Sequence, residues 1–67
     1  MTFDLRQARH FLAACDSGSI TRAADESCVT QPALSHSIRK LEESLGTKLF
    51  NRLPSGLELT ESGRRFE

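Results

Sequence analysis

The sequence has no tryptophan, no tyrosine and no excess of charge of either sign. Its aromatic residues are four phenylalanines, and nine basic residues balance nine acidic ones. A protein that coats nucleic acid without regard to sequence usually has a strong basic excess. The balanced charge of this chain is a poor match for that class of protein. The placement of the charges therefore matters more than their sum. Between Ser27 and Leu41 the chain has two basic residues and no acidic one.

Cysteine and long apolar runs are also scarce. Cys15 and Cys28 form no CxxC pair and no cluster with histidine, so neither a metal site nor a cofactor is predicted. The sequence has no secretory signal and no run of membrane-spanning length. We therefore expect a cytoplasmic protein without a membrane partner, whose two thiols are free and buried. No nucleophile–base constellation or phosphate-binding glycine loop is present, which argues against an enzyme.

A chain of 67 residues can form one small domain, for which a packing of about three helices is the upper limit. The apolar spacing predicts a first helix from about Leu5 to Cys15, with Asp4 as N-cap and Gly18 as the stop. Its expected buried stripe consists of Leu5, Ala8, Phe11, Leu12 and Cys15.

A second helix is predicted from its N-cap, Ser19, to about Glu26. It contains two adjacent alanines, which allow another helix to approach closely. A tight turn at Cys28–Val29 then leads to Thr30, the predicted N-cap of a third helix. Two helices joined by so short a turn are typical of helix-turn-helix DNA-binding proteins.

The third predicted helix, about residues 31–45, has the clearest pattern. Pro32 lies in its first turn, where the missing N–H costs nothing, and Gly46 ends it. The residues expected to be buried between the three helices include Val29 and the apolar row of this helix: Leu34, Ile38, Leu41 and Leu45. The opposite face of the helix is polar and basic and has no role in a core.

After Gly46 the pattern changes from helix to strand. Residues 48–52 and 57–60 are predicted as two short strands, joined by a turn at Leu53–Gly56. Such a hairpin is the wing of a winged helix. Thr60 can cap a further helix, of which the chain contains only the first residues, so we expect a fragment of a longer protein.

Three stretches of the sequence resemble the N-terminal DNA-binding domain of LysR-type transcriptional regulators. The family's opening helix and bracing helix are similar to LRQARHFLAACDSGSITRAA. Its recognition helix and the entry to its wing are similar to VTQPALSHSIRKLEESLGTKLFNR, and the start of its linker helix to LTESG. The sequence departs from the family pattern at Ser27, where leucine is usual, and at His36, where arginine is frequent.

The resemblance implies a mainly α fold, a winged helix-turn-helix of three helices plus a short β-hairpin. Residues 1–60 would form the DNA-binding domain, and residues 61–67 would begin a linker helix that mediates dimerisation. The intact protein would be a homodimer or homotetramer that binds a small-molecule effector through a C-terminal domain. The 67-residue chain alone would be a monomer or a weak dimer.

Double-stranded DNA is the expected partner of this domain, with the helix at 31–45 in the major groove and the hairpin at 49–60 as the wing. The candidates for base or groove contact lie on the outward face of that helix. They are Gln31, Pro32, Ser35, His36 and Arg39. The candidates for phosphate or wing contact are Ser19, Thr21, Arg22, Thr30 and Arg52.

These candidates also have simpler structural explanations. Arg39 can form an ion pair with Glu42 or Glu43 along its own helix, and Arg22 can pair with the acidic residues that follow it. Helix-start residues can serve as caps and nothing more. The alternative function is a winged-helix module that binds protein without DNA, which the balanced net charge and the outward Glu43 keep open.

Overall fold

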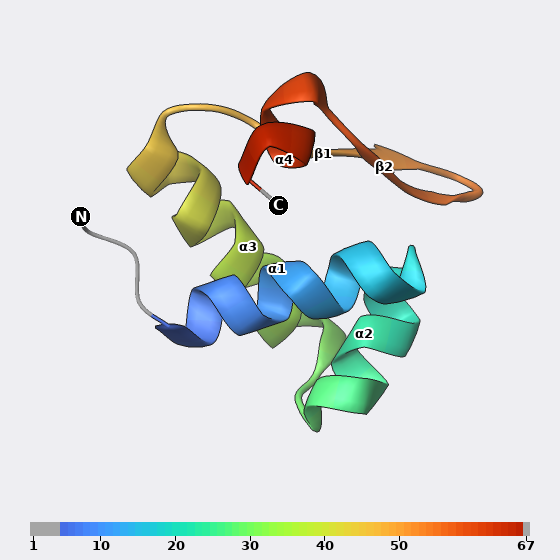
Figure 1. The fold of residues 1–67 in the computed structure, drawn as a ribbon. Coiled ribbons are helices and arrows are strands. Elements are labelled where there is room, and N and C mark those ends of the chain that lie inside the picture. The colour runs from blue at the N-terminus through green and yellow to red at the C-terminus, as the bar shows by residue number, and fades with distance from the viewer. Residues whose placement is uncertain (1–4, 67) are drawn as a thin grey trace.

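All the predicted helices and the hairpin form, in the predicted order. The computed structural model describes residues 5–66, so the predicted N-cap Asp4 lies outside the described residues. The elements are α1 (Leu5–Ser17), α2 (Ile20–Ser27), α3 (Gln31–Leu45), β1 (Phe50–Leu53), β2 (Gly56–Leu59) and α4 (Glu61–Phe66) (Figure 1). The fold is therefore a mainly α winged helix-turn-helix, as the sequence predicts.

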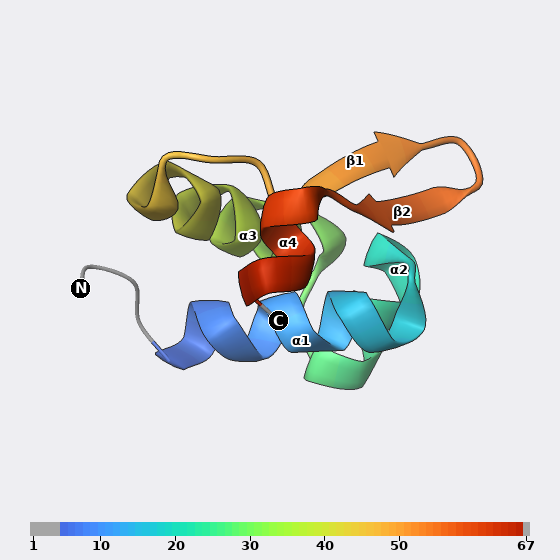
Figure 2. The same ribbon diagram turned by 45° about the horizontal axis from the view of Figure 1, so that its top comes forward.

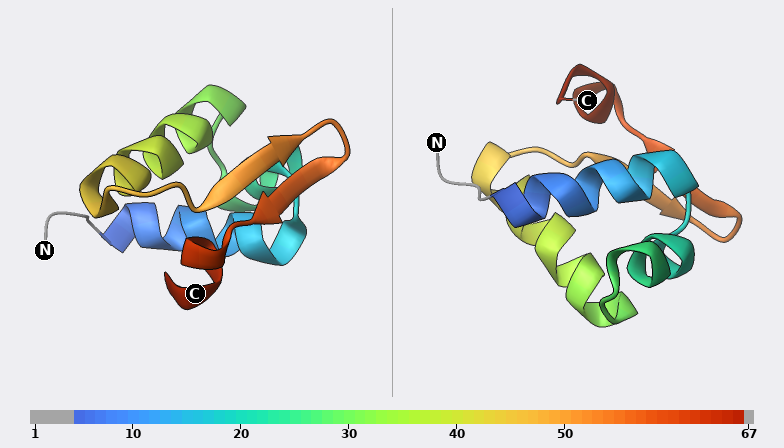
Figure 3. Two further views of the ribbon diagram at one scale, coloured as in Figure 1. Left: turned by 90° about the horizontal axis from the view of Figure 1, so that it is seen from above. Right: turned by 60° about the horizontal axis from the view of Figure 1, so that its bottom comes forward.

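The first three helices pack on one another, and the hairpin and α4 follow on one side of them. Figure 2 shows α4 above the middle of α1, between α3 and the hairpin. Figure 3 shows the hairpin projecting beyond the C-terminal end of α1, away from the chain's N-terminus. Within residues 5–66, no helix has the length and apolar character needed to cross a membrane.

The turns around α2 depend on capping residues. Ser19 Oγ accepts a hydrogen bond from the backbone N–H of Arg22 (3.3 Å), and Thr30 Oγ1 accepts one from Ala33 (3.2 Å). Both residues are therefore N-caps, as predicted. Cys28 ends α2 in the left-handed region, at φ 59°. Its side chain lies on the outer side of the turn and is exposed, so the expectation of a buried Cys28 thiol is wrong.

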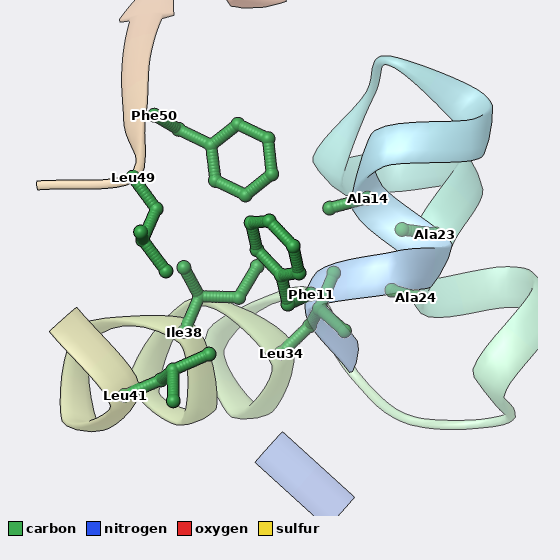
Figure 4. Packing of buried hydrophobic residues seen from close by; sticks show 9 residues of the cluster. All are labelled: Phe11, Ala14, Ala23, Ala24, Leu34, Ile38, Leu41, Leu49 and Phe50. Atoms are coloured by element: carbon green, nitrogen blue, oxygen red, sulfur yellow. The ribbon is translucent and has the colours of Figure 1, made fainter. Parts of the chain in front are cut away.

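The hydrophobic core lies where α1 and α3 meet the base of the hairpin (Figure 4). Its buried members are Phe11, Ala14, Ala23, Ala24, Leu34, Ile38, Leu41, Leu49 and Phe50. The Phe11 ring lies 5.3 Å from that of Phe50 and 5.2 Å from that of Phe66, measured between centroids. These distances are in the favourable range for aromatic pairs. Phe11 thereby joins α1 to both C-terminal elements.

The predicted buried stripe of α1 is partly wrong. Leu5 is 68% exposed and Leu12 is 48% exposed, whereas His10, Phe11 and Ala14 are buried. The helix is rotated relative to the prediction because Phe11 meets aromatic partners that lie far along the sequence. His10 faces α3, where its Nδ1 lies 2.8 Å from the hydroxyl oxygen of Ser37.

The apolar row of α3 is confirmed at Leu34, Ile38 and Leu41, each fully buried. Val29 and Leu45 pack against this core, but they are only partly buried. Val29 lies in the turn before α3, and Leu45 is the last residue of the helix. The expectation that Val29 is buried is therefore corrected to partial burial.

The hairpin has a shorter turn than predicted, and a residue just before its first strand is buried in the core. β1 pairs with β2 in antiparallel register, with Phe50 opposite Leu59 and Leu53 opposite Gly56. The turn therefore contains only two residues between the strands, instead of the predicted four at Leu53–Gly56. Leu49, just before β1, is fully buried. The segment expected to be wing alone thus supplies part of the core.

Two close approaches fix the hairpin and α4 against the rest of the domain. The Leu57 N–H donates to the Gly18 carbonyl (3.0 Å), and a Cβ added at Gly56, which has φ 140°, would lie 2.6 Å from the same oxygen. A Cβ at Gly63 would collide with the carbonyl oxygen of Leu49. Thr60 caps α4, as predicted, because its Oγ1 accepts from the Gly63 N–H (3.0 Å).

Replacement of Leu41 by alanine tests the core. Leu41 is fully buried, so Leu41→Ala should lower the free energy of unfolding by about 2–5 kcal/mol, through lost burial and the cavity left behind. The matched control is Leu5→Ala on α1, which should change it by less than about 0.5 kcal/mol because Leu5 is 68% exposed. Urea unfolding followed by circular dichroism measures both. Equal losses in the two variants would contradict this assignment of the core.

Candidate nucleic-acid interface

The outward face of α3 carries the predicted groove residues. Because an α-helix turns once every 3.6 residues, positions between those of the buried row face away from the core. Four of the five predicted residues are exposed, and Ser35 is partly buried. On this face lie Gln31, Pro32, Ser35, His36 and Arg39. The structure therefore brings together the whole predicted set on one helix surface.

Arg39 forms no ion pair with any residue in the range 5–66. One alternative partner, Glu42, is already engaged, because its Oε2 accepts from the backbone N–H groups of Leu49 (2.8 Å) and Phe50 (3.2 Å). The other, Glu43, is exposed on the same helix. The guanidinium of Arg39 is thus free to use its fork of donors on a phosphate or a guanine.

Arg52 and Ser35 connect the wing to α3. The Nη1 of Arg52 donates to Ser35 Oγ at 3.2 Å. Successive side chains of a strand point to opposite sides, so Arg52 shares its side of β1 with Phe50, which packs into the core. The strand pattern therefore directs Arg52 toward the helices. Sequence analysis proposed both residues as DNA contacts but did not predict that they contact each other.

The remaining phosphate candidates lie at the starts of α2 and α3. Thr21, Arg22 and Thr30 are exposed, and Ser19 is partly buried. Arg22 forms no ion pair with the acidic residues of α2 or with any other residue that the structure describes. A hollow separates the start of α2 from the tip of the hairpin, with Ser19 and Thr21 on one side and Arg52 on the other. Phosphate candidates from α2 and from the wing thus border one hollow.

Glu42 is a residue of this site that sequence reasoning missed. Its carboxylate fixes the two backbone N–H groups at the entry to β1, seven and eight positions later. Thr60 Oγ1 supports the same entry from the other side, because it donates to the carbonyl oxygen of Lys48 (2.6 Å). No local pattern predicts these contacts, because they join segments separated by a turn. Together they fix the wing relative to α3.

The described residues contain no group of three or more side chains suited to hold a metal ion. A short helix, a tight turn, a helix with a free polar face and an anchored hairpin define a winged helix-turn-helix domain. The arrangement can place one helix in a major groove of DNA and the hairpin beside it.

Comparison with known proteins agrees with this class. The family model described as "Bacterial regulatory helix-turn-helix protein, lysR family" matches residues 5–64. The transcriptional activator AmpR of Pseudomonas aeruginosa is 54% identical over 59 residues, which cover 88% of this chain and 20% of that protein. The transcriptional regulator BudR of Klebsiella aerogenes is 48% identical over 63 residues, which cover 94% of this chain and 44% of that protein.

Solved structures give the same result. The complex of the CbnR DNA-binding domain with DNA superimposes with a TM-score of 0.93 at 34% identity, covering 96% of this chain and 74% of that one. The complex of the BenM DNA-binding domain with catB site 1 DNA gives a TM-score of 0.91 at 41% identity. This match covers 96% of this chain and 72% of that one.

The chain belongs to the LysR family of bacterial transcriptional regulators and forms its helix-turn-helix DNA-binding domain. This confirms the predicted family and fold, and it favours DNA binding over the protein-only module. The relatives are transcriptional regulators and not enzymes. The chain spans less than half the length of the two curated relatives named above.

The role of Glu42 can be tested against its neighbour. Glu42→Ala should lower the free energy of unfolding by about 1–3 kcal/mol, because it leaves the N–H groups of Leu49 and Phe50 without their acceptor. Glu43→Ala removes the same charge from an exposed position and should change stability by less than about 0.5 kcal/mol. Urea unfolding of both variants measures the difference. A Glu42 variant as stable as the Glu43 variant would rule out the proposed anchoring of the hairpin.

Proposed function

We propose that α3 reads base edges in the major groove and that Gln31, Ser35 and Arg39 carry the direct contacts. The observation that carries this proposal is the set of polar side chains on the outward face of a helix whose other face is core. Arginine suits guanine, and glutamine suits adenine, through paired hydrogen bonds. Two structural relatives are described as complexes of a LysR-family DNA-binding domain with DNA, which supports the proposal.

Pro32 and His36 complete the proposed groove surface. Pro32, near the start of α3, offers an apolar contact to a thymine methyl group. His36 offers a ring nitrogen to a base edge or a phosphate. An imidazole lacks the planar five-donor fork of arginine, so a histidine at this position favours a different base preference from an arginine.

Phosphate contacts are proposed on both sides of α3. The starts of α2 and α3 offer the positive ends of two helix dipoles, together with the hydroxyls of Ser19, Thr21 and Thr30. Arg22 on α2 and Arg52 on the wing add cationic groups. Such contacts fix the position and orientation of the domain on the duplex, while the base contacts provide sequence preference.

The assignment of Arg39 predicts a specific loss. Arg39→Ala should weaken binding to a preferred duplex by about 1–3 kcal/mol and relax the preference at one base position. The control is Arg64→Ala, which removes an exposed arginine that does not lie on α3 and should preserve the preference. Fluorescence anisotropy on a site selected from random duplex DNA measures both. Unchanged affinity in the Arg39 variant would overturn this assignment.

We also propose that the regulator acts in the cytoplasm as a homodimer or homotetramer and that a further C-terminal domain binds a small-molecule effector. The curated relatives are longer than this chain, which leaves room for such a domain. Two linked DNA-binding domains bind paired half-sites with a higher effective concentration than one alone. Residues 61–67 are proposed as the start of the helix that links the two subunits.

The 67-residue chain itself should be largely monomeric in dilute solution. Its exposed large apolar side chains are few among the described residues, namely Leu5, Leu12 and Leu53. A stable interface buries about 1,200–2,000 Å² of surface in total, which these side chains do not provide. Sedimentation velocity at micromolar concentration measures the mass directly. A tight dimer under these conditions would contradict the expectation.

A further inference from the structure

We propose that Arg52 is a positioning residue for base recognition: it acts through Ser35 and determines which base edge that hydroxyl contacts. The proposal rests on base reading by α3, and it adds a role for a wing residue that touches no base. The observation behind it is the hydrogen bond from the Arg52 guanidinium to Ser35 Oγ, at 3.2 Å, which joins a wing residue to a residue of α3.

The position of Arg52 is fixed by contacts on both sides of it. Glu42 Oε2 holds the backbone N–H of Phe50, two residues earlier in the strand. Arg52 pairs across the hairpin with Leu57, whose N–H donates to the Gly18 carbonyl at 3.0 Å. The strand therefore cannot slide relative to α3 without breaking hydrogen bonds. This rigidity allows a residue on the wing to set the orientation of a hydroxyl on the helix.

The chemistry of the two groups determines the direction of their hydrogen bond. A guanidinium has five N–H donors and no acceptor, so the Ser35 oxygen must accept. Its single proton then remains available for DNA. Ser35 held in this way directs its proton to acceptor atoms such as guanine O6, thymine O4 or a purine N7, and only one lone pair remains for the amino groups of cytosine and adenine.

Without Arg52 the Ser35 hydroxyl can rotate and either donate or accept. Base edges that present an acceptor atom and base edges that present an amino group are then both tolerated. In the free protein Arg52 is exposed, and its hydrogen bond competes with water. When DNA covers α3, water is excluded and the same bond becomes stronger. The other N–H groups of Arg52 remain free for a phosphate. A single residue would thus couple a contact with the DNA backbone to the base preference of Ser35.

The test is selection of sites from a random duplex DNA pool by the 67-residue chain and four variants. Ser35→Ala identifies the base position that Ser35 reads, because preference there is lost. Arg52→Ala should reduce preference at that same position by about three- to tenfold, the size of one hydrogen bond. The double variant should match Ser35→Ala at that position. Arg22→Ala, the control, should weaken binding to all sites equally, as expected for a phosphate contact alone.

Each result leads to a decision. Convergence of the Ser35 and Arg52 variants on one base position supports the proposal. If Arg52→Ala weakens all sites equally, like Arg22→Ala, the proposal is overturned while base reading by α3 stands. A Ser35→Ala variant with all preferences intact also overturns it. If the parent chain enriches no sequence, the proposed function itself fails. Thermal unfolding of each variant, expected near the parent's Tm because Arg52 and Arg22 are exposed and Ser35 is only partly buried, shows that the fold is intact.

Discussion

The arrangement of the domain depends on the packing of the buried Phe11 ring. Its ring touches Phe50 at the base of the hairpin and Phe66 on α4, so one side chain joins three parts of the chain. Aromatic side chains dominate the energetics of a small core, and this sequence has few of them. Because Phe11 and the row on α3 face each other, the other face of α3 takes no part in the core. The proposed DNA-binding surface is a consequence of this packing.

The hairpin depends on polar contacts more than on its own strand pairing. An isolated two-stranded hairpin is at best marginally stable in water, and here each strand has four residues. Glu42 fixes the entry to β1, Gly18 accepts from β2, and Thr60 holds the carbonyl before β1. The wing therefore has a defined place beside α3, which a flexible loop of the same composition would lack.

Local sequence signals predicted the helices well, whereas contacts between distant segments escaped prediction. The bounds of α2 and α3 follow from capping residues that act within three or four positions, so Ser19 and Thr30 were assigned correctly. The buried face of α1 was not predicted correctly, because the orientation of this helix depends on aromatic partners far along the chain. Burial of Leu49 and the role of Glu42 were missed for the same reason. The outward residues of α3 were predictable because the apolar row fixes the opposite face.

The balanced net charge has a structural explanation that bears on recognition. Glu42 is used to hold the hairpin and Glu61 pairs with Arg65, so neither carboxylate opposes the arginines beside α3. Arg22, Arg39 and Arg52 are exposed and form no ion pair within residues 5–66, although the total charge of the chain is zero. The balanced net charge limits long-range attraction to phosphates, so we expect binding to non-specific DNA to depend on the few local arginine contacts. On the proposed function, discrimination then depends on the few base contacts of α3, and added affinity must come from joining two such domains on one operator.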